Sequence, residues 1–167
     1  MSEPSAEAIP ERILLQTRGD YLEGVDRLLG LARLELRIFD PDLSELEINS
    51  TGRIEMLTRF LRGNRMRRIF VALHDIEHVT KRCPRLITLM GSYTSALLIF
   101  QTRGEAAKVQ DCFVLADGDH LVRRPGTTQP RGVLVISDPK ECQPMRERFD
   151  EIWESSVQTV SAITTGL

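Results

Sequence analysis

The stretch Gln110-Asp-Cys-Phe-Val-Leu-Ala-Asp117, followed by Gly118-Asp-His-Leu-Val-Arg-Arg-Pro125, decides the fold of this chain. It predicts a strand over 111–116, a two-residue Gly-Asp turn and a strand over 121–124, because Asp and Gly favour tight turns between apolar runs. A third strand over 132–137 follows, and apolar spacing then predicts a helix over 139–160 that begins at Asp138-Pro139. The last third of the chain is therefore predicted to be hairpin-connected strands closed by a long helix.

Upstream of this hairpin, strands and helices alternate along the chain. Strands are predicted over 12–17, 34–39, 66–73 and 95–101, and helices over 19–32, 51–63 and 75–90, the last one broken at Pro84. Such alternation favours a parallel sheet covered by helices on both faces. The predicted fold class is α/β, with a mixed, largely parallel sheet sandwiched between helices.

Composition indicates one domain in a reducing compartment. With 167 residues and 41% hydrophobic content, the chain is long enough to bury a core without disulfides or metals. Residues 1–10 are predicted to be a disordered lead, and residues 11–167 a single domain. The three cysteines are odd in number and contain no C-x-x-C pair, and no apolar run is long enough to span a bilayer. A cytoplasmic location is therefore expected.

The hairpin and the order of elements around it resemble one half of the phospholipase D superfamily. The signature of that family is H-x-K-x4-D, then six residues, then G-S-x-N, and the closing Phe149-x-x-Ile-Trp153-x-x-Ser156 adds to the likeness. With the family's aspartate at Asp117, the His and Lys positions carry Gln110 and Cys112. The family's Gly, Ser and Asn positions carry Arg124, Pro125 and Thr127. Only the aspartate matches.

The resemblance implies a non-catalytic homodimer. In the family's enzymes two such motifs meet at one pocket, where one His becomes a phosphohistidine, the other protonates the leaving group and the lysines hold the phosphoryl charge. An amide such as Gln110 has no basic lone pair, and Cys112 supplies no fixed positive charge. Some inactive relatives bind phosphoinositide-containing membranes, so anionic lipid or another phosphate-bearing ligand is expected, with no cofactor. A single half must pair with a second copy to imitate the two-motif site.

Five residues of the hairpin form the predicted ligand-binding site. They are Gln110, Asp117, His120, Arg123 and Arg124. If the hairpin occupies the family's active-site position, the arginines can hold an anion in two-point contact without catalysis. Two plainer interpretations stay open: the Asp-Gly-Asp segment is simply a turn, and strand alternation sends some of these side chains outward. Cys112 is expected to be a small core residue.

Two other functions are weighed against the binding module. One is a divergent phosphodiesterase or nuclease that uses His120 or His74 in place of the lost histidine. The other is a regulatory domain that dimerises with a partner enzyme. His74-Asp-Ile-Glu-His78 is a literal H-x-x-E-H zinc motif, but a strand ending at residue 73 leaves His74 outside the helix, so no metal site is predicted.

Arginines also cluster around the turn at Gly63-Asn64. They are Arg59, Arg62, Arg65, Arg67 and Arg68. The plain interpretation is a solvated helix end with cations near its negative pole. The functional one is a patch for the phosphates of lipid or nucleic acid, and nucleic acid is disfavoured because aromatic residues make up only 5% of the chain. The formal net charge of −2 means that any anion binding must come from such a local patch.

Overall fold

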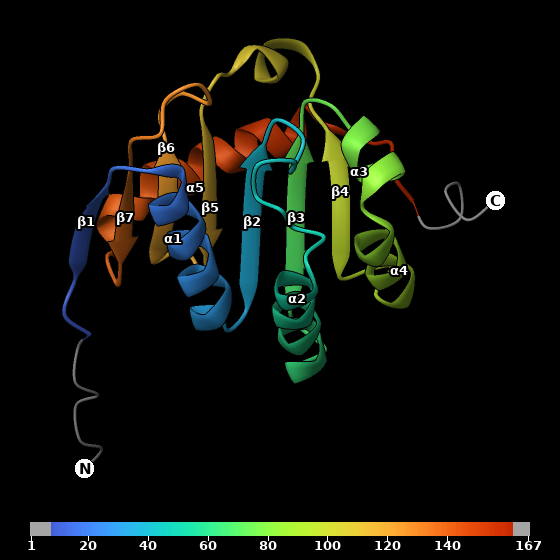
Figure 1. Cartoon of the computed structure of the whole chain (residues 1–167), viewed down its shortest axis with the longest axis horizontal. Helices are drawn as coiled ribbons and strands as arrows, with labels where there is room; N and C mark the ends of the chain where they lie inside the picture. The colour runs from blue at the N-terminus through green and yellow to red at the C-terminus, as the bar shows by residue number, and fades with distance from the viewer. Residues whose placement is uncertain (1–7, 162–167) are drawn as a thin grey trace.

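The computed structural model describes residues 8–161, which build one sheet between two layers of helices (Figure 1). The sheet order is β1-β7-β6-β5-β2-β3-β4-β8. The strands are β1 (Glu11–Leu15), β2 (Glu35–Asp40), β3 (Arg68–Leu73), β4 (Leu97–Gln101), β5 (Cys112–Ala116), β6 (His120–Arg124), β7 (Gly132–Ile136) and β8 (Val157–Gln158). The predicted lead 1–10 lies mostly outside the described residues.

The sheet is mixed, as predicted, but the prediction that it is largely parallel was wrong, because most neighbouring strands pair antiparallel. Strand β3 pairs parallel with β2 and with β4, and the other neighbours pair antiparallel. The parallel part arises from helical crossovers, since parallel strands need a connection that returns the chain to the same edge. The antiparallel part arises from the hairpins of the last third. The predicted α/β class is confirmed.

Helices cover both faces of the sheet. Four lie on one face, namely α1 (Arg18–Leu31), α2 (Thr51–Gly63), α3 (Glu77–Arg82) and α4 (Pro84–Ser92), and α5 (Pro139–Glu154) lies behind the other (Figure 1). Every residue of β5 is buried, because its two faces belong to different cores. Val114 packs in the core under α1–α4, while Phe113 packs against α5. Strand β5 is therefore apolar on both sides.

Helices α1, α2 and α5 each begin with a side-chain cap. Thr17 and Asp20 form a reciprocal capping box at α1, and the Asp138 side chain accepts the backbone N–H of Glu141 at the start of α5. Helix α2 begins at Thr51 and is capped by the Ser50 side chain, which accepts the backbone N–H of Arg53. The helix predicted over 75–90 is broken before Pro84 as expected, because proline cannot continue the helical hydrogen bonds.

The terminal helix is shorter than predicted. It ends at Glu154 rather than at Val160, and the hydroxyl of Ser156 donates to the carbonyl of Ile152. Val157 then pairs with Gln101 in β8, and Val160 is fully buried in the core of the opposite face. The apolar spacing that continues past Glu154 therefore serves a strand and a second core, which the helical period alone could not distinguish.

Candidate functional site

The β5–β6 hairpin separates the predicted site residues instead of gathering them. Its register places Cys112 opposite Arg124 at one end and Ala116 opposite His120 at the turn end. Gln110 precedes β5 and is exposed, with its amide donating to the carbonyl of Lys108. Because strand side chains alternate, Arg123 and Arg124 point to opposite faces. The five residues thus divide among two ends and two faces of the hairpin.

Asp117 occupies the turn and holds the backbone of a neighbouring segment. Its φ of 58° and the φ of 84° at Gly118 make these the two left-handed residues of the turn, which runs over 117–119 rather than through a two-residue Gly-Asp loop. Its carboxylate accepts the backbone N–H groups of Arg33, Leu34 and Glu35 at 2.8, 2.7 and 3.0 Å. Asp117 therefore joins the turn to the start of β2.

His120 is also engaged at the turn end. Its side chain is 10% exposed, and its Nδ1 accepts the backbone N–H of Ser137 at 3.0 Å. Accepting through Nδ1 places the ring proton on Nε2, which lies 3.5 Å from the Asp119 carboxylate. The imidazole therefore ties β6 to the end of β7 and lies at the opposite end of β6 from Arg124.

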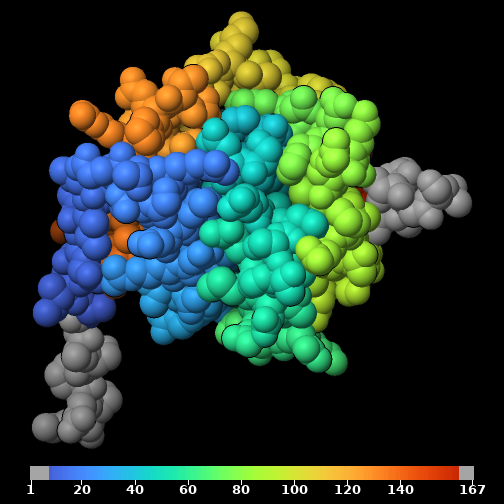
Figure 2. Space-filling view, in the orientation of Figure 1, coloured from blue at the N-terminus to red at the C-terminus, as the bar shows by residue number. Residues whose placement is uncertain are grey.

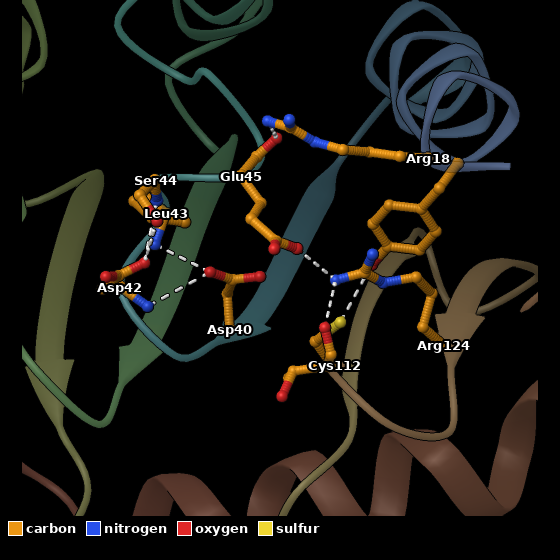
Figure 3. A network of polar contacts seen from close by, with 10 residues as sticks. Arg18, Asp40, Asp42, Leu43, Ser44, Glu45, Cys112 and Arg124 are labelled. Atoms are coloured by element: carbon orange, nitrogen blue, oxygen red, sulfur yellow. Dashed lines mark hydrogen bonds and ion pairs between the residues drawn. The ribbon is translucent and has the colours of Figure 1, made fainter. Parts of the chain in front are cut away.

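Arg124 lies in a buried polar network at the other end of the hairpin (Figure 3). Its Nη2 donates to Glu45 Oε2 at 2.5 Å, and its guanidinium lies 4.9 Å from the centre of the Tyr21 ring. The Tyr21 hydroxyl lies 3.7 Å from the Cys112 sulfur. Cys112 is fully buried, and burial, followed by the charge of Asp40, raises the pKa of its thiol. Cys112 is thus a core thiol, as expected.

Asp40 is the buried carboxyl of this network. It ends β2, is 4% exposed, and accepts the backbone N–H groups of Leu43 and Asp42 at 2.7 and 3.2 Å (Figure 3). Burial raises its pKa to about 6, although the two N–H groups act in the opposite direction. Asp40, Glu45 and Tyr21 were not predicted from the sequence, because Asp40-Pro41 indicates only the end of a strand.

The cavity beside this network is acidic. It has a volume of about 300 Å³, and its lining is Asp40, Pro41, Asp42, Ser44, Glu45, Thr127 and Thr128. Three carboxyl groups line it and no basic side chain does. Arg124, the nearest predicted cation, is already paired with Glu45. This end of the sheet therefore disfavours an anionic ligand.

Arg123 lies on the opposite face and is likewise paired. Its Nε donates to Asp111 at 3.1 Å, and Arg148 of α5 makes a two-point contact with the same carboxylate. Asp111 is 4% exposed. The three side chains fasten α5 to the hairpin, so Arg123 has a structural partner rather than a free guanidinium.

His74 has both ring nitrogens bonded. Nε2 lies 2.8 Å from the Val109 carbonyl, which can only accept, so Nδ1 is left to accept the Thr102 hydroxyl at 2.7 Å. His74 follows β3 and His78 belongs to α3, so the H-x-x-E-H residues do not share one helix. Within residues 8–161, no three His, Cys, Asp or Glu side chains are grouped to hold a metal ion.

One family model covers most of the chain. The family model described as Domain of unknown function (DUF7931) matches residues 17–162. No curated protein sequence matches the chain. Among residues 8–161, no helix has the length and apolar character needed to cross a membrane.

Solved structures show the same fold. Nuc of Salmonella typhimurium, a phospholipase D family member, has a TM-score of 0.61 and 12% identity over 92% of this chain and 100% of its own. NucT of Helicobacter pylori has a TM-score of 0.62 and 10% identity over 90% and 99%. TrmBL2, an archaeal chromatin protein with a novel mode of DNA binding, has a TM-score of 0.67 and 11% identity over 93% of this chain but only 56% of its own. The likeness confirms a phospholipase D-like fold.

Proposed function

The chain belongs to the family of the domain of unknown function DUF7931, and we propose that it is a non-catalytic phospholipase D-like domain that binds a phosphate-bearing ligand as a homodimer. One observation carries the non-catalytic part. The end of β5 that holds the resembled motif's His and Lys positions carries an exposed amide and a fully buried thiol, beside a cavity lined by three carboxyl groups. An amide has no basic lone pair, a fully buried thiol with a raised pKa supplies no accessible thiolate to attack phosphorus, and neither group carries a positive charge.

The competing enzyme function would need one of two histidines as nucleophile. Both Nδ1 atoms accept hydrogen bonds, from the Thr102 hydroxyl to His74 and from the Ser137 backbone to His120. A nucleophilic imidazole needs a free lone pair facing the substrate. These contacts support the binding module over a divergent phosphodiesterase or nuclease.

A hydrolysis assay separates the two functions. We expect the wild-type chain to release no nitrophenol from bis(4-nitrophenyl) phosphate above the buffer rate, and to leave supercoiled DNA intact. His74→Ala and His120→Ala are assayed beside it. Hydrolysis by the wild type that either substitution abolishes would establish the enzyme and end the non-catalytic proposal.

The proposed ligand class is supported by the phospholipase D-like fold and by the arginine cluster around Gly63-Asn64. Anionic lipid is the first candidate, and duplex DNA is the comparison ligand because TrmBL2 is described as binding DNA. Binding should weaken as salt rises, since screening reduces attraction between exposed charges. A chain that binds neither ligand at low salt would leave only the partner-enzyme regulator among the functions considered.

The homodimer has a candidate surface in the sheet itself. Strand β1 is at the end of the sheet and pairs only with β7 within the described residues. Leu14 on this strand is 69% exposed and Ile13 is 41% exposed. An open strand edge with apolar side chains is a template for pairing with a second copy.

A further inference from the structure

A second charged region lies at the amino ends of the parallel strands, opposite to the strand ends that face the acidic cavity. The segments between α1 and β2, α2 and β3, and α4 and β4 all enter the amino ends of the parallel strands, and they lie along the lower part of Figure 1 and of Figure 2. We call this region the basic edge. Its residues are Leu31, Arg33, Leu34, Arg62, Arg65, Met66, Arg67 and Arg68.

The basic edge contains a cavity of about 550 Å³ with no acidic lining. The lining is Leu61, Arg62, Asn64, Arg65, Arg67, Arg68 and the segment 92–96. A second cavity of about 230 Å³ shares Arg67 and also lacks a carboxylate in its lining. Four guanidinium groups therefore surround open space without a neutralising side chain.

These four arginines lack the carboxylate partners that eight other arginines of the described residues have. Within residues 8–161, none of the four makes an ion pair, whereas Arg12, Arg27, Arg37, Arg53 and Arg59 each contact a carboxylate. Arg68 donates to the carbonyls of Arg65 and Arg67 at 2.8 and 2.9 Å. Arg67 donates to the Phe60 carbonyl at 3.0 Å. Backbone carbonyls therefore hold the Arg67 and Arg68 side chains, and the positive charge of all four arginines is left for an external anion.

Exposed apolar side chains accompany these charges. Met66 is 67% exposed at the tip of the α2–β3 loop, Leu34 is 49% exposed before β2, and Leu31 is 37% exposed at the end of α1. The backbone N–H of Arg68 donates to the Leu34 carbonyl at 3.1 Å, so the two loops lie side by side. Apolar groups interleaved with arginines suit the boundary between headgroups and acyl chains.

We propose that the basic edge docks onto an anionic lipid surface. The unpaired arginines bind headgroup phosphates, while Met66 and Leu34 enter the region just beneath them. A nucleic-acid backbone offers phosphates but no apolar phase, so it would leave Met66 and Leu34 in water. The proposal rests on the proposed function and supplies its ligand and site.

Vesicle sedimentation tests the site directly. Wild-type chain is mixed with phosphatidylcholine vesicles and with vesicles that also contain phosphatidylglycerol, at low and at physiological salt. We expect binding to the anionic vesicles only. Each basic residue near an anionic surface is worth about fivefold in affinity, so Arg62→Glu with Arg65→Glu should weaken binding at least roughly tenfold. Met66→Ser should weaken it roughly tenfold as well, through lost apolar burial.

The matched control is Arg82→Glu with Arg103→Glu. Both residues are exposed, neither makes an ion pair in the described part of the chain, and both lie outside the basic edge. This double variant changes the charge equally and should bind as wild type or less than about threefold more weakly. Urea unfolding of every variant confirms that the fold is intact.

The remaining outcomes separate the site from the function. Equal loss in both double variants, or in neither, would place lipid binding elsewhere and overturn the basic edge while leaving the phosphate-binding function intact. Binding of duplex DNA but not of vesicles, lost on Arg62→Glu with Arg65→Glu, would make the edge a nucleic-acid site and overturn the lipid assignment. Binding of neither ligand by the wild type would overturn both proposals.

Discussion

At the residue scale, Asp117 joins the hairpin turn to the segment that begins β2. Its carboxylate accepts three backbone N–H groups from the segment that begins β2. We expect Asp117→Ala to lower the free energy of unfolding by about 2–3 kcal/mol, because charged hydrogen bonds to several donors are lost together. Asp117→Asn keeps one acceptor and tolerates the left-handed backbone, so it should cost about 1 kcal/mol. Urea titrations measure both, and an unchanged Asp117→Ala midpoint would contradict this role.

Asp40 gives the chain a specific dependence on pH. Its folded pKa of about 6 exceeds the ordinary value of 3.8, so the folded chain holds a proton that the unfolded chain releases between these values. Stability from this group is therefore present below about pH 4 and is lost as the pH rises through about 6. The loss amounts to about 3 kcal/mol, at about 1.4 kcal/mol for each pKa unit.

Asp40→Asn isolates this contribution. The variant cannot ionise, so its unfolding free energy should rise relative to that of the wild type by about 2–3 kcal/mol between pH 4 and pH 7. Subtracting the two unfolding curves at each pH removes the titrations that both chains share. A difference that stays flat across this range would show that Asp40 ionises normally in the folded chain.

The burial and the secondary structure of residues near the hairpin could be predicted from the sequence, but their interaction partners could not. The sequence predicted that Cys112 is buried and that His74 lies outside a helix, since both follow from strand period and strand ends. It did not predict that Arg124 meets Glu45, because 79 residues separate them and their contact depends on how the loop after β2 folds over β6. Ionic partners so distant in sequence leave no local pattern.

At the element scale, the contact of Asp111 with Arg148 and Arg123 joins α5 to the sheet. Asp111→Ala would leave two guanidinium groups, each about one third exposed, without their carboxylate. We expect a loss of about 2 kcal/mol in unfolding free energy, below the range for fully buried pairs because water screens both arginines.

Trp153 reports on this element directly. It is the only tryptophan, and its ring stacks on Phe100 with centroids 4.0 Å apart. Its fluorescence in a urea titration of Asp111→Ala should therefore follow the docking of α5. Glu147→Ala removes an exposed carboxylate from the same helix and should stay within about 0.5 kcal/mol of the wild type. Equal effects of the two substitutions would show that the Asp111 contacts do not hold α5.

Element types were easier to predict than element ends. Every predicted strand and helix has a counterpart, because period and turn residues are local signals. The end of α5 was wrong, since Val157 and Val160 continue the apolar spacing but pack at the sheet edge and in the other core. Only the completed sheet decides which surface these valines cover.

At the scale of the whole molecule, charged side chains of opposite sign gather at opposite ends of the parallel strands. The cavity after β2 is lined by carboxyl groups, and the α2–β3 loop together with the residues on either side of it carries the unpaired arginines. The net charge of −2 does not indicate this separation, because it is the sum of the charges at both ends of the strands. The Gly63-Asn64 arginine cluster marked the basic edge, whereas the predicted site residues are spread over both ends of the β5–β6 hairpin. Only the fold shows that the acidic cavity and the basic edge lie at opposite ends of the parallel strands.

The oligomeric state is also a property of the whole molecule. We expect light scattering after size exclusion to give twice the monomer mass, with two copies joined through the open edge of β1. Leu14→Lys should shift the mass to that of the monomer, because a charged side chain on an edge strand opposes pairing with another strand. Val157→Lys is the matched control, since Val157 is 43% exposed on β8 at the other end of the sheet. A dimer that survives Leu14→Lys but not Val157→Lys would move the interface to β8, and a monomeric wild type would remove the homodimer from the proposed function.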